Sequence, residues 1–250
     1  MISWEHVLLV FVVGIITGFI NTLSGSGSLI SLPVLMFIGL PPHVANGTNR
    51  IGILFQNLVG TANYYRQGVL DIGMGVRVAV PVILGAVSGA WIVTGISERA
   101  VEVSVAVVLL LMLFPLWFKP RQWLEGRDTS GDAHNKPLRW IIFFLVGMYG
   151  GYIQAGVGIF LLAALVLNAG YDLVRANGIK VFINLIFTPF ALAVFIWHGH
   201  VNWSVGLILA AGNGIGAWFA SQWSVAWGPA FVRYLLFVVI LGSGIKLLFF

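Results

Sequence analysis

Two cationic residues, Arg50 and Lys180, lie inside otherwise apolar stretches of the chain. An isolated charge in such a stretch is costly in a membrane, so it normally faces a cavity or a partner. All eight acidic residues fall in predicted loops or at helix ends, which leaves no buried carboxylate to neutralise either cation. The pair therefore predicts the binding of an anion. The alternative is that each long side chain extends to the membrane surface.

Amide and hydroxyl side chains accompany both cations. Asn46 and Asn177 occupy matching places ahead of them, and such amides either contact a substrate or join neighbouring helices. Their recurrence in both halves favours contact with a substrate, whereas for Asn57 and Thr188 neither role is favoured. The candidate binding residues of this group are Asn46, Thr48, Asn49, Arg50, Asn177, Lys180 and Asn184.

Two glycine-rich breaks interrupt the stretches 7–39 and 139–169, each of which is too long for one ordinary crossing. Flanking pieces of about 11–16 residues would span roughly 16–24 Å of helix, short of the roughly 30 Å hydrocarbon core. They predict either one kinked helix or a hairpin that turns back at mid-membrane. In a hairpin, the second half-helix would point free N–H groups at the centre, which suits an anion. The candidate binding residues of the breaks are Ser24, Gly25, Ser26, Gly27, Ser28, Gln154, Gly156 and Gly158.

The overall composition places these residues in a membrane protein. Hydrophobic residues make up 59% of the chain and charged residues 8%, against roughly 25% charged residues in soluble domains. Several apolar runs reach the roughly 20 residues of a spanning helix, and they are continuous, unlike the strands of a barrel. The sequence therefore predicts an all-α polytopic membrane protein. The predicted crossings are 44–66, 72–95, 100–118, 175–197, 203–224 and 229–249.

An internal repeat relates the two halves. Residues 131 positions apart match, including Gly25 with Gly156 and Gly27 with Gly158, which indicates a duplication. The predicted division is a first membrane repeat (1–118), a cytoplasmic basic linker (119–138) and a second membrane repeat (139–250). With hairpins the repeats are inverted, and ten of the 13 Lys and Arg then fall inside, as the positive-inside rule prefers. The predicted fold is thus two inverted repeats, each a half-helix hairpin plus three transmembrane helices.

Several function classes are excluded by what the sequence lacks. The chain has no cysteine, no Walker loop, no HExxH helix and no intramembrane aspartate pair. These absences argue against an enzyme, a bound metal, a cofactor and direct ATP-driven transport. Basic residues lie mostly in loops, where they orient a membrane protein, so nucleic-acid binding is not expected.

The break at 24–28 followed by Pro33, the stretch 39–49, their second copies and the basic central loop resemble the TauE/SafE sulfite-exporter family of bacterial membrane permeases. The resemblance covers essentially the whole chain. It implies export of a small anionic organosulfur compound, such as sulfite, sulfoacetate or a related organosulfonate, across the inner (plasma) membrane without a cofactor. The first break carries serines where the family often has glycines, and the second has Ala164 in place of the proline. These departures leave the substrate open.

The combined prediction is a secondary transporter that works by alternating access around a central site between two hairpin tips, one repeat moving against the other. The alternatives are a non-transporting accessory or assembly subunit of the membrane and a passive anion channel. The expected partners are the anion, the lipid bilayer and a possible second copy of the chain in a homodimer. The transport direction and any coupling ion are not fixed by these residues.

Overall fold

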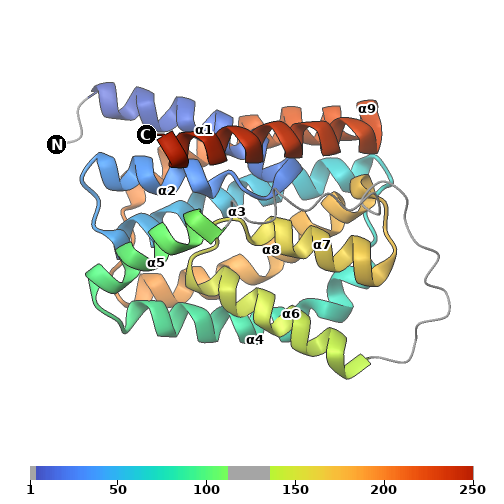
Figure 1. Cartoon of the computed structure of the whole chain (residues 1–250), viewed down its shortest axis with the longest axis horizontal. Coiled ribbons are helices and arrows are strands. Elements are labelled where there is room, and N and C mark those ends of the chain that lie inside the picture. Colours follow the sequence, from blue (N-terminus) through green and yellow to red (C-terminus); the bar gives the residue numbers. More distant parts are fainter. Residues whose placement is uncertain (1–3, 112–135, 250) are drawn as a thin grey trace.

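The computed structural model describes residues 4–111 and 136–249, and the regular secondary structure of this part of the chain is entirely α-helical (Figure 1). This confirms the all-α fold class. The predicted linker lies outside the described residues up to residue 135, as do residues 112–118 of one predicted crossing. The helices are α1 (Trp4–Ser24), α2 (Ser28–Phe37), α3 (Pro42–Arg66), α4 (Ile72–Thr94), α5 (Glu98–Leu111), α6 (Lys136–Tyr152), α7 (Val157–Ala169), α8 (Leu173–Trp197) and α9 (Trp203–Phe249).

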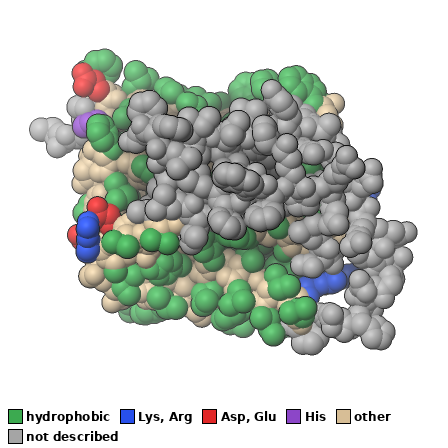
Figure 2. All heavy atoms as spheres, viewed as in Figure 1, with side chains coloured by type: hydrophobic (Ala, Val, Ile, Leu, Met, Phe, Trp, Pro, Cys, Tyr) green, Lys and Arg blue, Asp and Glu red, His purple; other side chains and the backbone are tan. Residues whose placement is uncertain are grey.

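Among the described residues, four helical segments are long and apolar enough to cross a membrane, namely α1, α4, α8 and Trp203–Trp227 of α9. On the face seen in Figure 2, hydrophobic side chains cover much of the described part, and the charged side chains in view lie toward the two ends of the long axis. This distribution is expected where lipid surrounds the middle of a protein. The multi-pass membrane prediction is therefore supported by composition, length and surface together.

Helix α3 has the length of a crossing but a far more polar sequence. Most of its polar residues are buried in the protein, whereas Arg66 in its last turn is exposed. The buried ones include His43, Asn46, Thr48, Asn49, Arg50, Gln56, Asn57 and Asn63. Because buried polar groups in a membrane protein mark functional sites, α3 is the helix around which the candidate site is built.

The last helix differs from the prediction of two separate crossings at 203–224 and 229–249. Residues 203–249 form one continuous helical stretch, which would be about 70 Å long if it were straight. Figure 1 shows instead that its final part (red) runs back across the molecule toward the C-terminus. The chain therefore reverses its direction within this helical stretch, and the helix is not interrupted.

Both interrupted stretches turn back on themselves. A Cβ built at Gly27 would meet the carbonyl oxygen of Thr17, although a straight helix would place these residues about 15 Å apart. In the second stretch, the Tyr149 hydroxyl donates to the carbonyl oxygen of Ala155, and its ring lies 5.1 Å from that of Phe160. Each chain segment therefore reverses at its glycine break, which excludes a single kinked helix in this structure.

The two hairpins open toward opposite ends of the molecule, α1–α2 to the left and α6–α7 to the right in Figure 1. Their pieces are less equal than predicted, because α1 has 21 residues and α2 only 10. The expected range of about 11–16 residues was therefore wrong for this hairpin, since α1 begins at Trp4 and continues to Ser24. The inverted repeat itself stays a prediction.

The helices pack across the two halves of the sequence. Helix α1 packs chiefly against α9, and α6 packs chiefly against α4. Backbones approach closely at both contacts, as small residues allow. A Cβ on Gly18 would collide with the backbone of Asn213, and one on Gly151 would collide with the backbone of Ala86.

These contacts define two groups of helices, each drawn from both halves of the chain. The first bundle contains α1, α2, α3 and α9, and the second bundle contains α4, α6, α7 and α8. Helices α3 and α8 make the most extensive contact between the bundles. The candidate residues on these two helices therefore lie at the boundary between the bundles.

Candidate functional site

Arg50 crosses from the first bundle to the second. Its side chain is completely buried, and its guanidinium donates to the carbonyl oxygens of Gly150 (3.1 Å) and Gly151 (2.5 Å) and to Oε1 of Gln154 (2.8 Å). Gly150 and Gly151 lie in the last turn of α6, where the helix dipole places partial negative charge. Phe195 of α8 packs 4.5 Å from the guanidinium carbon. Arg50 therefore caps the C-terminal end of α6.

Lys180 makes the corresponding contact in the other direction. Its ammonium group, also completely buried, donates to the carbonyl oxygens of Asn21 (3.2 Å) and Thr22 (2.7 Å) and to Oδ1 of Asn177 (2.8 Å). Asn21 and Thr22 belong to the last turn of α1. Each cation thus holds the end of the first hairpin helix of the opposite half.

The structure rejects the view that these side chains extend to the surface, because both are entirely enclosed by protein. Within residues 4–111 and 136–249, neither cation contacts a carboxylate, and the ion pairs of Arg99 and Arg175 lie at exposed positions. The partial negative charge of the two helix ends therefore offsets each buried cation only in part. Two buried basic side chains without a carboxylate partner would favour the entry of an anion.

The two hairpin tips meet. Backbone atoms of Gly25 and Gly158 approach so closely that a Cβ on either residue would overlap the other. Gly25 has a φ of +75°, which suits glycine at the turn. The serine hydroxyls of the first tip bond locally, with the Oγ atoms of Ser24 and Ser26 2.5 Å apart and Ser24 donating to the carbonyl of Ile20 at 2.8 Å. The two hairpin tips therefore lie in direct contact with each other in this structure.

The remaining predicted residues divide among three surroundings. Asn46 accepts from Arg50 at 3.5 Å and donates to the carbonyl of Tyr152 at 2.7 Å, so it belongs to the Arg50 cluster with Gln154. Asn49 links α3 to α2 through hydroxyl groups of Ser28 (3.1 Å) and Ser31 (2.7 Å).

The other predicted residues lie at turns, at the far side of α3 or, for Asn184, within α8. Thr48 accepts from the backbone N–H of Asn202 at 2.9 Å, in the loop between α8 and α9, so it does not join either cation. Gly27 packs against α1, and Gly156 precedes α7 with a φ of +74°. Asn184 is buried, and its Oδ1 has no hydrogen-bond partner.

Asn57 was not selected from the sequence, yet it is an unusual residue of the interior. Its side chain is completely buried, and neither its Nδ2 nor its Oδ1 has a partner. The sequence offered one signal, the match of Asn57 with Thr188 across the repeat. In the structure, Thr188 accepts a hydrogen bond from Gln154 at 3.2 Å. That signal was too weak to separate binding from packing.

Two further polar clusters lie at the ends of the bundles. At one end, the rings of His43 and His200 stack 4.8 Å apart, and burial, followed by the neighbouring His43 and His198, lowers the pKa of His200. Among the described residues, no group of three or more His, Asp or Glu is placed to hold a metal ion.

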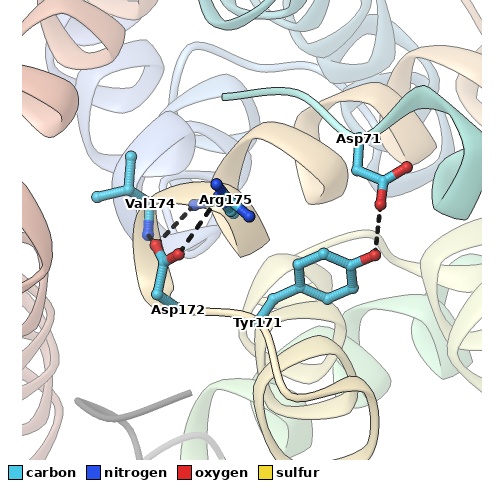
Figure 3. A network of polar contacts seen from close by, with 5 residues as sticks. All are labelled: Asp71, Tyr171, Asp172, Val174 and Arg175. Carbon is cyan, nitrogen blue, oxygen red and sulfur yellow. Dashed lines mark hydrogen bonds and ion pairs between the residues drawn. The ribbon is translucent and has the colours of Figure 1, made fainter. Parts of the chain in front are cut away.

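At the other end, the Tyr171 hydroxyl donates to Asp71 at 2.5 Å, which lowers the pKa of that carboxyl group (Figure 3). Asp172 caps α8 by accepting from the backbone of Val174 (2.9 Å) and Arg175 (3.0 Å). Asp71 likewise accepts from the backbone of Met74 at the start of α4. These contacts fix the N-terminal ends of α4 and α8 beside each other.

Comparison with known proteins gives one family. The family model described as "Sulfite exporter TauE/SafE" matches residues 10–247. A probable membrane transporter protein ORF9 of a Sinorhizobium species is 28% identical over 99% of this chain and 94% of its own length. The probable membrane transporter proteins YfcA of Escherichia coli and YunE of Bacillus subtilis are 25% and 24% identical, covering 96% and 88% of this chain and 88% and 87% of their own lengths. No solved structure matches the chain.

Proposed function

The chain belongs to the sulfite exporter TauE/SafE family of membrane transporters, which are not enzymes, and from this premise we propose that it exports a small sulfur-containing anion. Sulfite, sulfoacetate and related organosulfonates are the proposed substrates. The proposed location is a bacterial inner membrane, with the central basic loop in the cytoplasm. Transport would proceed as in a secondary carrier, without a cofactor.

The observation that carries this proposal is the pair of buried cations. Arg50 and Lys180 are both completely buried, and neither has a recorded carboxylate partner within the described residues. A cation-selective path would instead need buried acidic groups. The helix ends neutralise the two cations only in part. An anion that enters between the bundles would supply the remaining negative charge.

The same cations suggest how the bundles move. Arg50 on α3 holds α6, and Lys180 on α8 holds α1, so each cation links the first bundle to the second. A bound anion would compete with these carbonyl oxygens for the cations and so loosen both links. We therefore propose alternating access in which the two bundles, each drawn from both sequence halves, move against each other. The opposite openings of the two hairpins support an inverted repeat behind this motion.

The test is efflux of sulfite from proteoliposomes containing purified protein. Wild-type efflux should saturate with sulfite concentration, whereas a passive channel would give flux proportional to concentration. An accessory subunit would give no flux of sulfite or sulfoacetate. Arg50→Gln and Lys180→Gln should each weaken sulfite binding by about 1–3 kcal/mol, the range for losing a charge-assisted hydrogen bond. Wild-type affinity in both variants would contradict the assigned role of the cations.

A further inference from the structure

Unpaired polar atoms gather where α3 and α8 cross. Each of these residues has a buried side-chain atom without a hydrogen-bond partner, and the set is Thr22, Arg50, Asn57, Thr61, Asn177 and Asn184. Asn57 is the extreme case because it is completely buried and both of its amide atoms are unpaired. Native proteins pair nearly all buried polar groups, so a cluster of exceptions calls for a missing partner.

The contacts between α3 and α8 set the level of these residues. A Cβ on Gly60 would lie 3.0 Å from Val181, and one on Gly178 would lie 3.4 Å from Cβ of Tyr64. The helices are thus antiparallel, and their register places Asn57 level with Asn184.

The same helical geometry sets the direction in which Asn57 faces. Asn57 lies two turns from Arg50 and two turns from Tyr64, so all three share one face of α3. That face meets α8, because Tyr64 packs against Gly178 and Arg50 packs against Phe195. Asn184 lies one turn from Lys180 on α8. The two amides therefore sit between the two cations.

The hairpin tips leave no room for a ligand between them in this structure. A single Cβ on Gly25 or Gly158 would already overlap the opposite backbone. Lys180 has three N–H groups, and all three are engaged by Asn21, Thr22 and Asn177. Nε of Arg50, by contrast, is buried without a partner. The unpaired atoms that can contact a ligand are therefore those of the neutral groups and Nε of Arg50, and Lys180 can contact it directly only where its present bonds loosen.

We propose that Asn57 and Asn184 form the binding position of the transported anion, an inference that rests on the proposed function. The ligand is a small monovalent oxyanion that also carries a hydroxyl group, such as hydrogen sulfite. Whichever way its amide is turned, Asn57 presents an NH₂ group that can only donate and a carbonyl oxygen that can only accept. A fully deprotonated oxyanion would leave the acceptor unpaired, whereas a hydroxyl-bearing anion satisfies both.

The test compares Asn57→Leu and Asn184→Leu with Asn63→Leu. Leucine is similar to asparagine in size and removes both polar atoms. Asn63 is the matched control, since it is also buried on α3 but donates to Oγ of Ser221 at 2.8 Å. Sulfite efflux from proteoliposomes gives the apparent affinity, and thermal unfolding in detergent, with and without sodium sulfite, gives the stability.

Asn57→Leu and Asn184→Leu should weaken the apparent affinity for sulfite by about tenfold or more and abolish the rise in Tm with sulfite, while the Tm without ligand stays equal or increases. Asn63→Leu should lower the Tm and keep the wild-type affinity. As pH rises, hydrogen sulfite is converted to sulfite. In the wild type, the concentration of hydrogen sulfite at half-saturation should stay constant, while the total concentration needed for half-saturation should increase.

Three results would overturn this binding position. A Tm for Asn57→Leu that falls as far as that of Asn63→Leu would show that the amide is paired within the protein. Wild-type affinity in Asn57→Leu would remove Asn57 from the site while leaving the transporter intact. A half-saturating concentration that follows total sulfite would exclude the hydroxyl-bearing ligand. Failure of the wild type to move sulfite is a different result, because it overturns the proposed function.

Discussion

The contact between the hairpin tips can be tested by adding one methyl group at a time. Gly158→Ala introduces a Cβ against the backbone of Gly25 without any unusual backbone angle at position 158. Overpacking of this kind costs about 1–3 kcal/mol, and the upper end is expected because backbone, unlike a side chain, cannot rotate away. Gly25→Ala adds the strain of a φ of +75° to the same collision.

A third variant separates backbone strain from collision. Gly68 has a φ of +70°, but a Cβ there would meet nothing within 4 Å. Gly68→Ala should therefore cost only the left-handed conformation, about 1–2 kcal/mol. The expected order of destabilisation is Gly68→Ala, then Gly158→Ala, then Gly25→Ala, which combines both effects at roughly 2–5 kcal/mol.

Thermal unfolding of the purified variants in detergent measures this order. For a chain of this size, about 1 kcal/mol corresponds to a shift in Tm of roughly 2–4 °C. Gly158→Ala should therefore lower the Tm by up to about 10 °C, and Gly68→Ala by about half as much. A Gly158→Ala protein as stable as the wild type would refute the contact between the tips. Equal shifts for Gly25→Ala and Gly68→Ala would refute it as well.

Three further results are expected. Cysteines placed at the start of α1 and in the loop before α3 should react with an impermeant thiol reagent from the same face of the membrane; reaction from opposite faces contradicts the hairpin. A disulfide between Tyr64→Cys and Gly178→Cys, where the Cβ separation is 3.4 Å, should stop transport by joining the bundles, whereas a thiol-reactive linker joining Phe11→Cys to Ile208→Cys within the first bundle should not. Transport that survives the disulfide would rule out motion between the bundles. Because His200 has a lowered pKa in the folded state, stability should fall as pH drops through the usual histidine range near about 6.5, and His200→Gln should lose part of that fall in Tm.

The sequence was informative where one residue type answers to one physical demand. Arg50 and Lys180 stand out because a charge in an apolar helix needs a reason, and their burial agrees with that expectation. The glycine breaks could likewise be located, since unbroken helices of that length do not fit a membrane. Continuous apolar runs then predicted most of the helices, although not the full length of α1 or the continuity of α9.

The pairing of helices could not be read in the same way. A small-residue face such as that of Gly14 and Gly18 announces a close neighbour, but it does not say which helix that neighbour is. The two asparagines of α3 show the same limit at the level of single residues. Asn63 donates a hydrogen bond to Ser221, whereas the side chain of Asn57 has no hydrogen-bond partner, although both asparagines are buried. Only the packing of the other helices distinguishes them.

The pairing of α1 with α9 also determines how long α1 remains without its packing partner while the chain is being synthesised. Gly14 and its neighbour Gly212 are separated by almost the whole chain, so at about 5–20 residues per second the ribosome needs about 10–40 s to deliver the second after the first. During that interval α1 lies in the membrane with its glycine face unmatched, open to whatever insertion factor or protease first recognises it. Helix α4 waits in the same way for α6, but for a shorter time. Neither half can then mature alone, and two separately synthesised halves should assemble only when both are present in the same membrane.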